Sequence, residues 1–281
     1  MIGGANIVDN SRKGDSELKS FPDSRISTID VGELGLKKHH IKALLEIDVT
    51  HARDILRIIK GRNGYGLSFT AWLVKCISTA VSEFRESNAF LKNSKTLIIF
   101  NDIHISITVE KQYDGTNVPL PYVIRNTNNK SIAEIHHEIR KAKQDAAEDG
   151  KVVIGESYGK FSTKLFLSLP GFIRRWVWKS FLLKPYIAQK NMGSVMLTSV
   201  GMYSSFNGWI IPTSIHPLCF AVGTITKKPG VIEGDIAIRE YLKMTVLIDH
   251  DVMDGAPAAR FLSRLDELMQ KAYGLDEELQ F

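Results

Sequence analysis

A histidine flanked by acidic residues stands near the C-terminal end of the chain, in the run Asp249-His250-Asp251-Val252-Met253-Asp254-Gly255. An imidazole ionises near neutral pH and therefore suits general base catalysis. The run follows a predicted strand and precedes a predicted helix, so rigid backbone would present the His250 side chain. Asp254 could orient this turn by pairing with an arginine, and Gly255 permits a close backbone approach. The structural alternative is that Asp254 only caps the helix and that His250 only ends the strand.

The elements around this turn are a strand at Ala237–Ile248 and an amphipathic helix at Asp254–Tyr273. A further strand, Val118–Ile124, contains two prolines and is therefore expected at a sheet edge. Strands and helices mix without regular alternation, which predicts an α/β (α+β) fold with a mixed β-sheet flanked by helices. Residues 25–281 are expected to form one domain, and residues 1–24 a flexible N-terminal segment. The other predicted elements are strands at His39–Val49, Ser194–Val200 and Leu218–Ile225, a hairpin within Thr96–Glu110 around Asn101-Asp102, and helices at Ser68–Arg85 and from the capping box Ser131–Glu134 to Asp149.

Composition narrows the class of protein. The chain has 281 residues, of which 44% are apolar and 24% charged, as in ordinary globular domains. Its two cysteines, Cys76 and Cys219, are far apart in sequence, which suits a reducing compartment and excludes a cysteine-rich metal site. No signal peptide and no run of about 18 apolar residues is present, so we expect a cytoplasmic protein. The sequence contains no phosphate-binding loop and no dinucleotide fingerprint, and no metal site is predicted.

The turn motif has the form H-x-x-x-D-G, and here the sequence resembles the catalytic domain of the dihydrolipoamide acyltransferases of 2-oxoacid dehydrogenase complexes, relatives of chloramphenicol acetyltransferase. The resemblance rests on four segments in family order between about Arg25 and Tyr273. They are LLEIDVT from Leu44, NVPLPYVIRNTNNKSIAEIHHEI from Asn117, GSVMLTSVGMYSS from Gly193, and LIDHDVMDGAPAARFL ending in the helix after Gly255.

The resemblance implies roles for five residues. His250 would take the proton from the thiol of coenzyme A (CoA) or of a dihydrolipoyl group, and Thr198 would stabilise the resulting oxyanion. Asp254 would be structural and paired with Arg25, and Gly255 would support the turn. The family forms homotrimers with active sites between subunits, so His250 of one subunit would face Thr198 of its neighbour. The expected function is transfer of an acyl group between CoA and a thiol (dihydrolipoyl), alcohol or amine. The alternative is a catalytically silent trimeric scaffold or docking subunit.

Two departures from the family pattern limit this inference. Only about 25 residues precede Arg25, too few for a lipoyl domain, so a lipoyl group would act in trans if at all, on a separate lipoyl-domain protein. Alternatively the acceptor is a small alcohol, amine or thiol. Asp251 stands where the family has an arginine, and it could raise the pKa of His250 if it lies close or point into solvent.

The segment at about 152–191 is longer than the connection usual in the family, and we expect it to be an insertion. Between Phe161 and Lys190 it carries six basic residues and no acidic one, so the rest of the chain has 30 basic and 31 acidic residues. Aromatic and basic side chains alternate here. The segment could form a pocket wall beside Thr198, pack on the trimer or a larger assembly, dock a partner, or lie on an anionic membrane. Nucleic acid is not expected, because the basic residues sit within a strongly apolar stretch.

Overall fold

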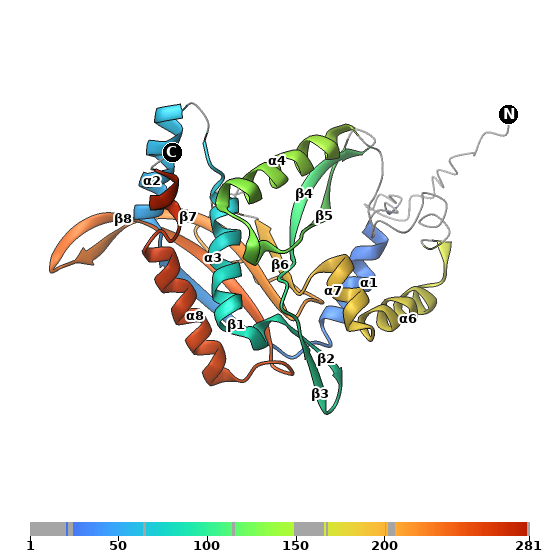
Figure 1. Cartoon of the computed structure of the whole chain (residues 1–281). Helices are drawn as coiled ribbons and strands as arrows, with labels where there is room; N and C mark the ends of the chain where they lie inside the picture. Colours follow the sequence, from blue (N-terminus) through green and yellow to red (C-terminus); the bar gives the residue numbers. More distant parts are fainter. Residues whose placement is uncertain are drawn as a thin grey trace, which may run out of the picture.

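The computed structural model describes residues 21, 25–63, 66–113, 116–148, 166, 168–199, 201 and 206–279. Six strands form one sheet in the order β1-β8-β7-β6-β4-β5 (Figure 1). Strand β6 is parallel to both of its neighbours, and the remaining pairs are antiparallel, so the sheet is mixed as predicted. The strands are β1 (His40–Asp48), β4 (Ile105–Tyr113), β5 (Thr116–Ile124), β6 (Val195–Ser199), β7 (Leu218–Ile232) and β8 (Asp235–Asp249).

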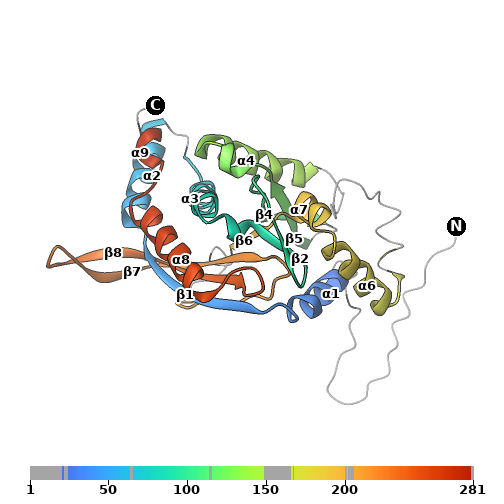
Figure 2. The ribbon, with the colours of Figure 1, turned by 60° about the horizontal axis from the view of Figure 1, so that its bottom comes forward.

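Helices cover one face of this sheet (Figure 2). The core between them and the sheet contains Trp72, Phe220 and Phe261, all fully buried. Burying three aromatic side chains in one layer supplies a large share of the hydrophobic stabilisation. The described residues thus confirm the predicted sheet flanked by helices. The covering helices are α2 (Thr50–Asn63), α3 (Phe69–Glu83), α4 (Ile132–Glu148), α8 (Gly255–Gln270) and the short α9 (Leu275–Glu278).

Local signals in the sequence explain several of these boundaries. Helix α4 begins at the predicted capping box, where the Ser131 backbone N–H donates to Glu134 Oε2 (2.8 Å) and the Glu134 N–H donates to Ser131 Oγ (3.2 Å). Strand β5, with its two prolines, is an edge strand as predicted. The turn between β7 and β8 has positive φ at Glu233 and Gly234, which matches the right-handed twist of a hairpin.

The predicted hairpin around Asn101-Asp102 is wrong. Strand β3 (Thr96–Ile99) pairs with β2 (Ala89–Asn93) in a small separate sheet, and β4 joins the main sheet between β6 and β5. The turn instead carries the chain from one sheet to the other. The Asn88 side-chain amide fixes it by donating to the carbonyls of Phe100 and Asp102. A short 3-10 turn precedes β2 (Arg85–Asn88) and another precedes α4 (Thr127–Asn129).

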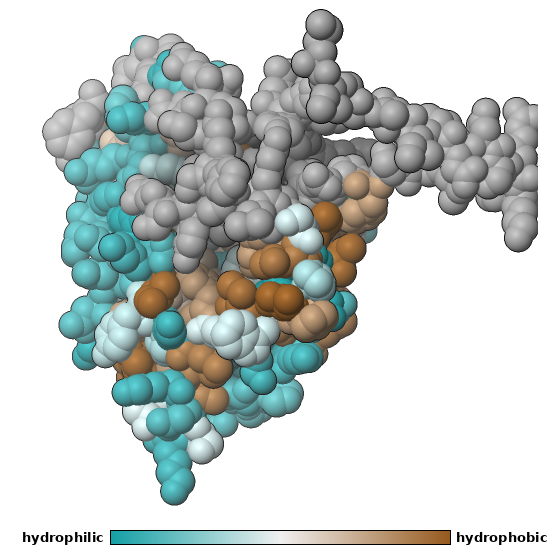
Figure 3. Space-filling view, turned by 90° about the vertical axis from the view of Figure 1, so that its right-hand side faces the viewer, coloured by the Kyte–Doolittle hydropathy of each residue, from teal (hydrophilic) through white to brown (hydrophobic). Residues whose placement is uncertain are grey.

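A second group of helices lies beside the sheet rather than on it. Helix α1 (Ile26–Gly35) packs against α6 (Gly171–Leu182), and α6 against α7 (Pro185–Met192), at the right of Figure 1. None of the residues of α6 is buried. Apolar side chains gather on this side of the molecule (Figure 3). Residues 1–20, 22–24 and 152–165, which belong to the predicted flexible segment and the predicted insertion, lie outside the described residues.

Candidate active site

The turn that follows β8 is anchored by Asp249, whose side chain is fully buried. Its carboxylate accepts a hydrogen bond from Lys38 Nζ (2.7 Å) and a longer one from the Asp251 N–H (3.3 Å). Its backbone carbonyl accepts from the N–H groups of Val252 and Met253. A buried carboxylate needs such a partner because an unpaired charge away from water is costly. The turn is therefore fixed from inside the protein.

His250 projects from this fixed turn into solvent. Its backbone N–H donates to the carbonyl of His39 (2.9 Å), which ties the turn to the start of β1. Its side chain is 52% exposed, and its Nδ1 lies 3.8 Å from Asp254 Oδ1, too far for a hydrogen bond. The imidazole is thus exposed to solvent on a turn whose backbone is anchored by hydrogen bonds.

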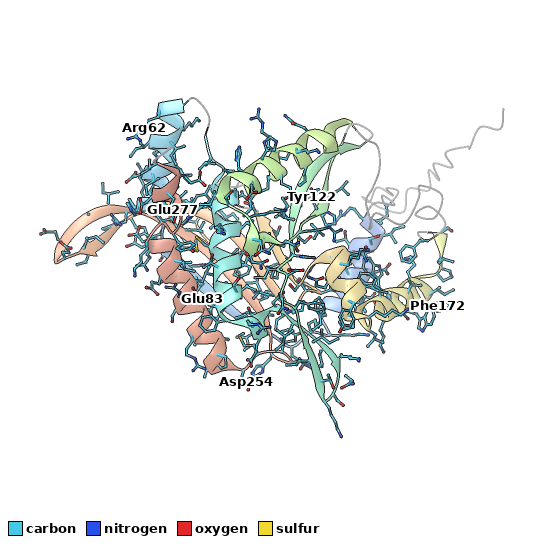
Figure 4. The ribbon with its side chains drawn as sticks, viewed as in Figure 1. Arg62, Glu83, Tyr122, Phe172, Asp254 and Glu277 are labelled. Carbon is cyan, nitrogen blue, oxygen red and sulfur yellow. The ribbon has the colours of Figure 1, made fainter. Side chains whose placement is uncertain are left out.

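Asp254 is the N-cap residue of α8, in extended conformation and without a side-chain capping bond. Its side chain is 86% exposed at the N-terminal end of α8 (Figure 4). The predicted pairing with Arg25 does not form within the chain. Helix α1 carries Arg25 about 15 Å from its other end, where Lys38 meets the turn, and the Arg25 guanidinium lies over the Phe21 ring at 5.5 Å. Lys38 and Asp249 supply the ion pair that we had expected from Arg25 and Asp254.

Gly255, the first residue of α8, has open space around it. A Cβ atom at this position would meet no atom within 4 Å, and its φ is not in the left-handed region. The predicted close backbone approach is therefore not made within the chain.

Thr198 lies in β6 and is partly exposed. The strand register places Thr198 beside Ala221 of β7 and Ala221 beside Thr245 of β8, so the three form one row across the sheet. Neighbouring residues Leu197 and Phe220 belong to the core under the helices. Since side chains alternate along a strand, Thr198 faces the opposite side of the sheet, away from that helical layer.

Two buried polar residues on this second face were not singled out from the sequence. The Thr245 hydroxyl and the Lys243 ammonium are buried without a hydrogen-bond partner among the described residues. Lys243 Nζ lies 3.7 Å from Glu46 Oε1 and 5.2 Å from the centroid of the Trp209 ring. In the sequence of β8, Lys243 and Thr245 alternate with apolar core residues. This alternation is the only feature of the sequence that indicates the face of the sheet on which they lie. The face that carries Thr198 is therefore polar even where it is buried.

One chain does not bring His250 and Thr198 together. His250 lies beyond the end of β8, five residues from Thr245, which shares the row of Thr198. That distance is about 17 Å along the strand, and the row itself adds two strand spacings, about 10 Å. No single substrate carbon can touch both side chains within one subunit.

The Asp251 side chain pairs with a different histidine, His39. Its carboxylate contacts His39 Nδ1 at 2.9 Å. This hydrogen bond raises the pKa of His39. Asp251, at the position where the family pattern has an arginine, is thus held by His39, the residue before β1.

Other groups with catalytic potential are buried. Burial raises the pKa of the Cys76 and Cys219 thiols, so neither supplies a thiolate nucleophile at neutral pH. Burial lowers the pKa of His216 to about 4, so this histidine is neutral at pH 7. Among the described residues no three histidine, cysteine, aspartate or glutamate side chains gather as metal ligands.

The fold and the exposed histidine at the end of β8 define an α/β transferase domain. The family model for the 2-oxoacid dehydrogenases acyltransferase (catalytic domain) matches residues 7–162 and 189–275. The chain belongs to this family of acyltransferases. The unmatched stretch between these two ranges, residues 163–188, contains α6 and the beginning of α7.

Curated relatives agree with this assignment. The chain is 24% identical over 278 residues to the lipoamide acyltransferase component of the branched-chain alpha-keto acid dehydrogenase complex of Bacillus subtilis, covering 92% of this chain and 56% of that protein. It is also 24% identical to the dihydrolipoyllysine-residue acetyltransferase component of the pyruvate dehydrogenase complex of B. subtilis, covering 82% of this chain and 44% of that protein. The chain therefore spans about half the length of these relatives.

Solved structures share the fold. Dihydrolipoamide acetyltransferase of Azotobacter vinelandii superposes with a TM-score of 0.68 at 21% identity, over 98% of this chain and 99% of that one. That structure was solved to study the catalytic roles of a serine, a histidine and an asparagine. A probable dihydrolipoamide acetyltransferase of Listeria monocytogenes gives a TM-score of 0.67 at 21% identity, over 92% and 96% of the two chains.

Proposed function

We propose that the protein transfers an acyl group between CoA and the thiol of a dihydrolipoyl group, with His250 as the general base. The observation that carries this proposal is the position of His250. Its side chain is half-exposed, and its backbone is fixed by a buried ion pair in a chain of the acyltransferase family. The histidine and the asparagine studied in the A. vinelandii enzyme are four residues apart. This is the spacing of His250 and Asp254.

The reaction needs one proton transfer in each direction. His250 takes the proton from the acceptor thiol, and the thiolate attacks the carbonyl carbon of the acyl thioester. The tetrahedral intermediate carries a negative oxygen, to which Thr198 Oγ1 donates a hydrogen bond. Collapse of the intermediate breaks the bond to the leaving thiolate, which recovers the proton from His250. The acyl group passes directly between the two sulfurs, so no covalent intermediate with the enzyme forms.

The distance between His250 and Thr198 supports an active site made by two subunits of a homotrimer. The hairpin of β7 and β8 offers an assembly surface, because it projects from the body of the domain (Figure 1). At its tip Ile236 and Ile238 are 79% and 76% exposed. Large exposed apolar side chains of this kind mark a contact surface. We expect the trimer to build the active sites, whether or not it joins a larger assembly.

The second substrate is less well defined than CoA. The relatives are named as components of pyruvate and branched-chain 2-oxoacid dehydrogenase complexes. We therefore place the dihydrolipoyl group of a lipoyl domain first among the acceptors, and small alcohols and amines second.

Replacement of His250 by alanine tests this function. Acetyl-CoA and free dihydrolipoamide are mixed with the protein, and release of the CoA thiol is followed. Because general base catalysis contributes about a hundredfold to ten-thousandfold, H250A should lose that factor in kcat while keeping its oligomeric mass and circular dichroism. Wild-type turnover in H250A would overturn the assignment of the base. If the wild-type protein transferred no acyl group to any acceptor and bound no CoA by calorimetry, the result would favour a silent scaffold.

A further inference from the structure

Helix α6 exposes a stripe of large apolar side chains. Phe172, Trp176 and Leu183 are spaced so that they fall on one side of an α-helix. Their exposed fractions are 68%, 68% and 61%. Phe172 points outward from the body of the domain in Figure 4. We call these three residues the α6 stripe. Its exposure is unusual, because side chains of this size are normally buried.

The orientation of the stripe is fixed from the other side of the helix. Arg174 Nε lies 2.7 Å from Asp30 Oδ2, and Asp30 is fully buried beneath α1 and α6. Arg175 Nε lies 3.1 Å from Glu33 Oε2. Because both arginines turn toward α1, the stripe on the opposite side faces outward. Helix α6 is thus presented as a rigid element of the domain.

Basic side chains lie within and beside the α6 stripe. Lys179, Lys184 and Lys190 are all exposed, and in the described part of the chain no acidic side chain pairs with them. The sequence has no aspartate or glutamate between residues 166 and 192. Tyr186 of α7 adds a further exposed aromatic ring, with 67% of its surface accessible. The surface therefore combines exposed apolar and aromatic side chains with exposed lysines, and Figure 3 shows apolar side chains gathered on this side of the molecule.

We propose that α6 docks the protein on the surface of an anionic phospholipid bilayer. An interfacial helix buries an apolar face among the lipid headgroups and acyl chains while lysines at its sides meet the anionic headgroups. Aromatic rings such as Trp176 and Tyr186 suit this boundary because they are partly apolar and partly polar. The family model does not cover residues 163–188, so α6 is not an element of what the family shares. In the described residues no helix is both long and apolar enough to cross a membrane.

Several alternatives from the sequence are less well supported. A pocket wall beside Thr198 does not fit, because the main neighbours of α6 are α1 and α7 rather than β6. A groove for a protein segment is not formed either, because the stripe stands on a single outward-facing helix. Residues 166–192 also carry basic side chains and no acidic ones, and this excess of positive charge complements an anionic surface.

The test is sedimentation of the full chain with vesicles of phosphatidylcholine, with or without phosphatidylserine. The wild-type protein should bind vesicles that contain phosphatidylserine, and added salt should weaken binding. The double variant F172S/W176S should bind at least about tenfold more weakly, because it removes two inserting side chains. The triple variant K179A/K184A/K190A should lose about fivefold for each lysine at low salt.

Control variants alter exposed apolar and basic side chains elsewhere. I58S/L97S removes exposed apolar residues from α2 and β3, and K60A/K92A/K141A removes three exposed lysines from other surfaces. Both controls should bind vesicles as the wild-type protein does. Absence of vesicle binding, equal binding to neutral vesicles, or equal loss in the controls would overturn the proposal. A changed oligomeric mass in F172S/W176S would overturn it too, because the stripe would then be a contact between subunits.

This inference is independent of the proposed function. Acyl transfer with soluble substrates should be unchanged in F172S/W176S, and vesicle binding should be unchanged in H250A. Loss of one property therefore leaves the other measurable.

Discussion

Thr198 is the residue whose role depends most on its hydroxyl group. If Thr198 Oγ1 donates to the oxyanion, T198A should lower kcat about a hundredfold to a thousandfold, or about 2.7–4 kcal/mol of transition-state stabilisation. T198S keeps the donor and should retain most of the activity. Because the residue lies partly exposed in β6, T198A should unfold at nearly the wild-type temperature. Equal activity of T198A and T198S would show that the hydroxyl is not used.

Asp251 and His39 form an exposed pair one residue away from the general base. The hydrogen bond that His39 donates to Asp251 raises the pKa of His39. The pair therefore stabilises the folded protein below the ordinary pKa of histidine, and this stabilisation is lost as pH rises through the raised value. D251N should return the His39 pKa toward 6.5, which NMR titration of the imidazole measures. The pH profile of kcat/KM should stay unchanged in D251N. A shift in that profile would mean that Asp251 acts on His250 instead.

At the scale of elements, His216 connects three segments. Its Nε2 lies 3.0 Å from the carbonyl of Met192 at the end of α7, which can only accept, so Nε2 carries the hydrogen. Its own carbonyl accepts from His40 Nε2 of β1 (2.9 Å). The neighbouring carbonyl of Pro217 accepts from the N–H of Asp249, at the catalytic turn. His216 thus connects α7, through its buried imidazole, and β1, through its backbone carbonyl, to the loop before β7.

The buried state of His216 predicts a loss of stability in mild acid. Burial lowers its pKa to about 4, so between pH 6.5 and 4 the unfolded chain binds a proton that the folded chain does not. The free energy of unfolding should fall by about 3 kcal/mol over this range because of this one group. H216N, which cannot titrate, should show a correspondingly shallower decrease in urea unfolding at the two pH values. The same slope in both proteins would exclude His216 as the cause.

Elements marked by features within a few neighbouring residues were predicted correctly from the sequence. Elements whose position depends on a distant pairing strand were not. The capping box before α4 and the prolines of β5 act within a few residues, and both predictions were confirmed. The alternation of apolar and polar residues predicts a strand but does not identify the strand with which it pairs. The hairpin around Asn101 was misassigned for this reason. Strand β7 is longer than predicted because Lys227 to Gly230 resembles a turn but lies in a projecting hairpin.

The same distinction applies to the candidate site. The turn after β8 and the strand that holds Thr198 follow from sequence motifs. The ion pair between Lys38 and Asp249 joins residues 211 positions apart, and the contact between His39 and Asp251 joins residues 212 apart. Nothing local signals contacts of this kind. The predicted pairing of Asp254 with Arg25 is not made within the chain, because α1 separates Arg25 from the turn.

At the scale of the whole molecule, the separation of His250 from Thr198 predicts complementation between inactive subunits. Coexpression of H250A and T198A chains should restore activity that neither variant has alone. In a randomly mixed trimer about one quarter of the interfaces join a T198A subunit, which supplies His250, to an H250A subunit, which supplies Thr198. The measurement is the acyl transfer rate of the purified mixed trimer.

The matched control coexpresses T198A with the double variant H250A/T198A. This mixture has the same number of assembled subunits but contains no interface with both functional side chains, so it should stay at the activity of T198A. If the first mixture were no more active than this control, each active site would lie within a single chain. That outcome would require a conformational change that closes about 17 Å along β8. A large gain in the first mixture alone would instead place one active site between each pair of neighbouring subunits.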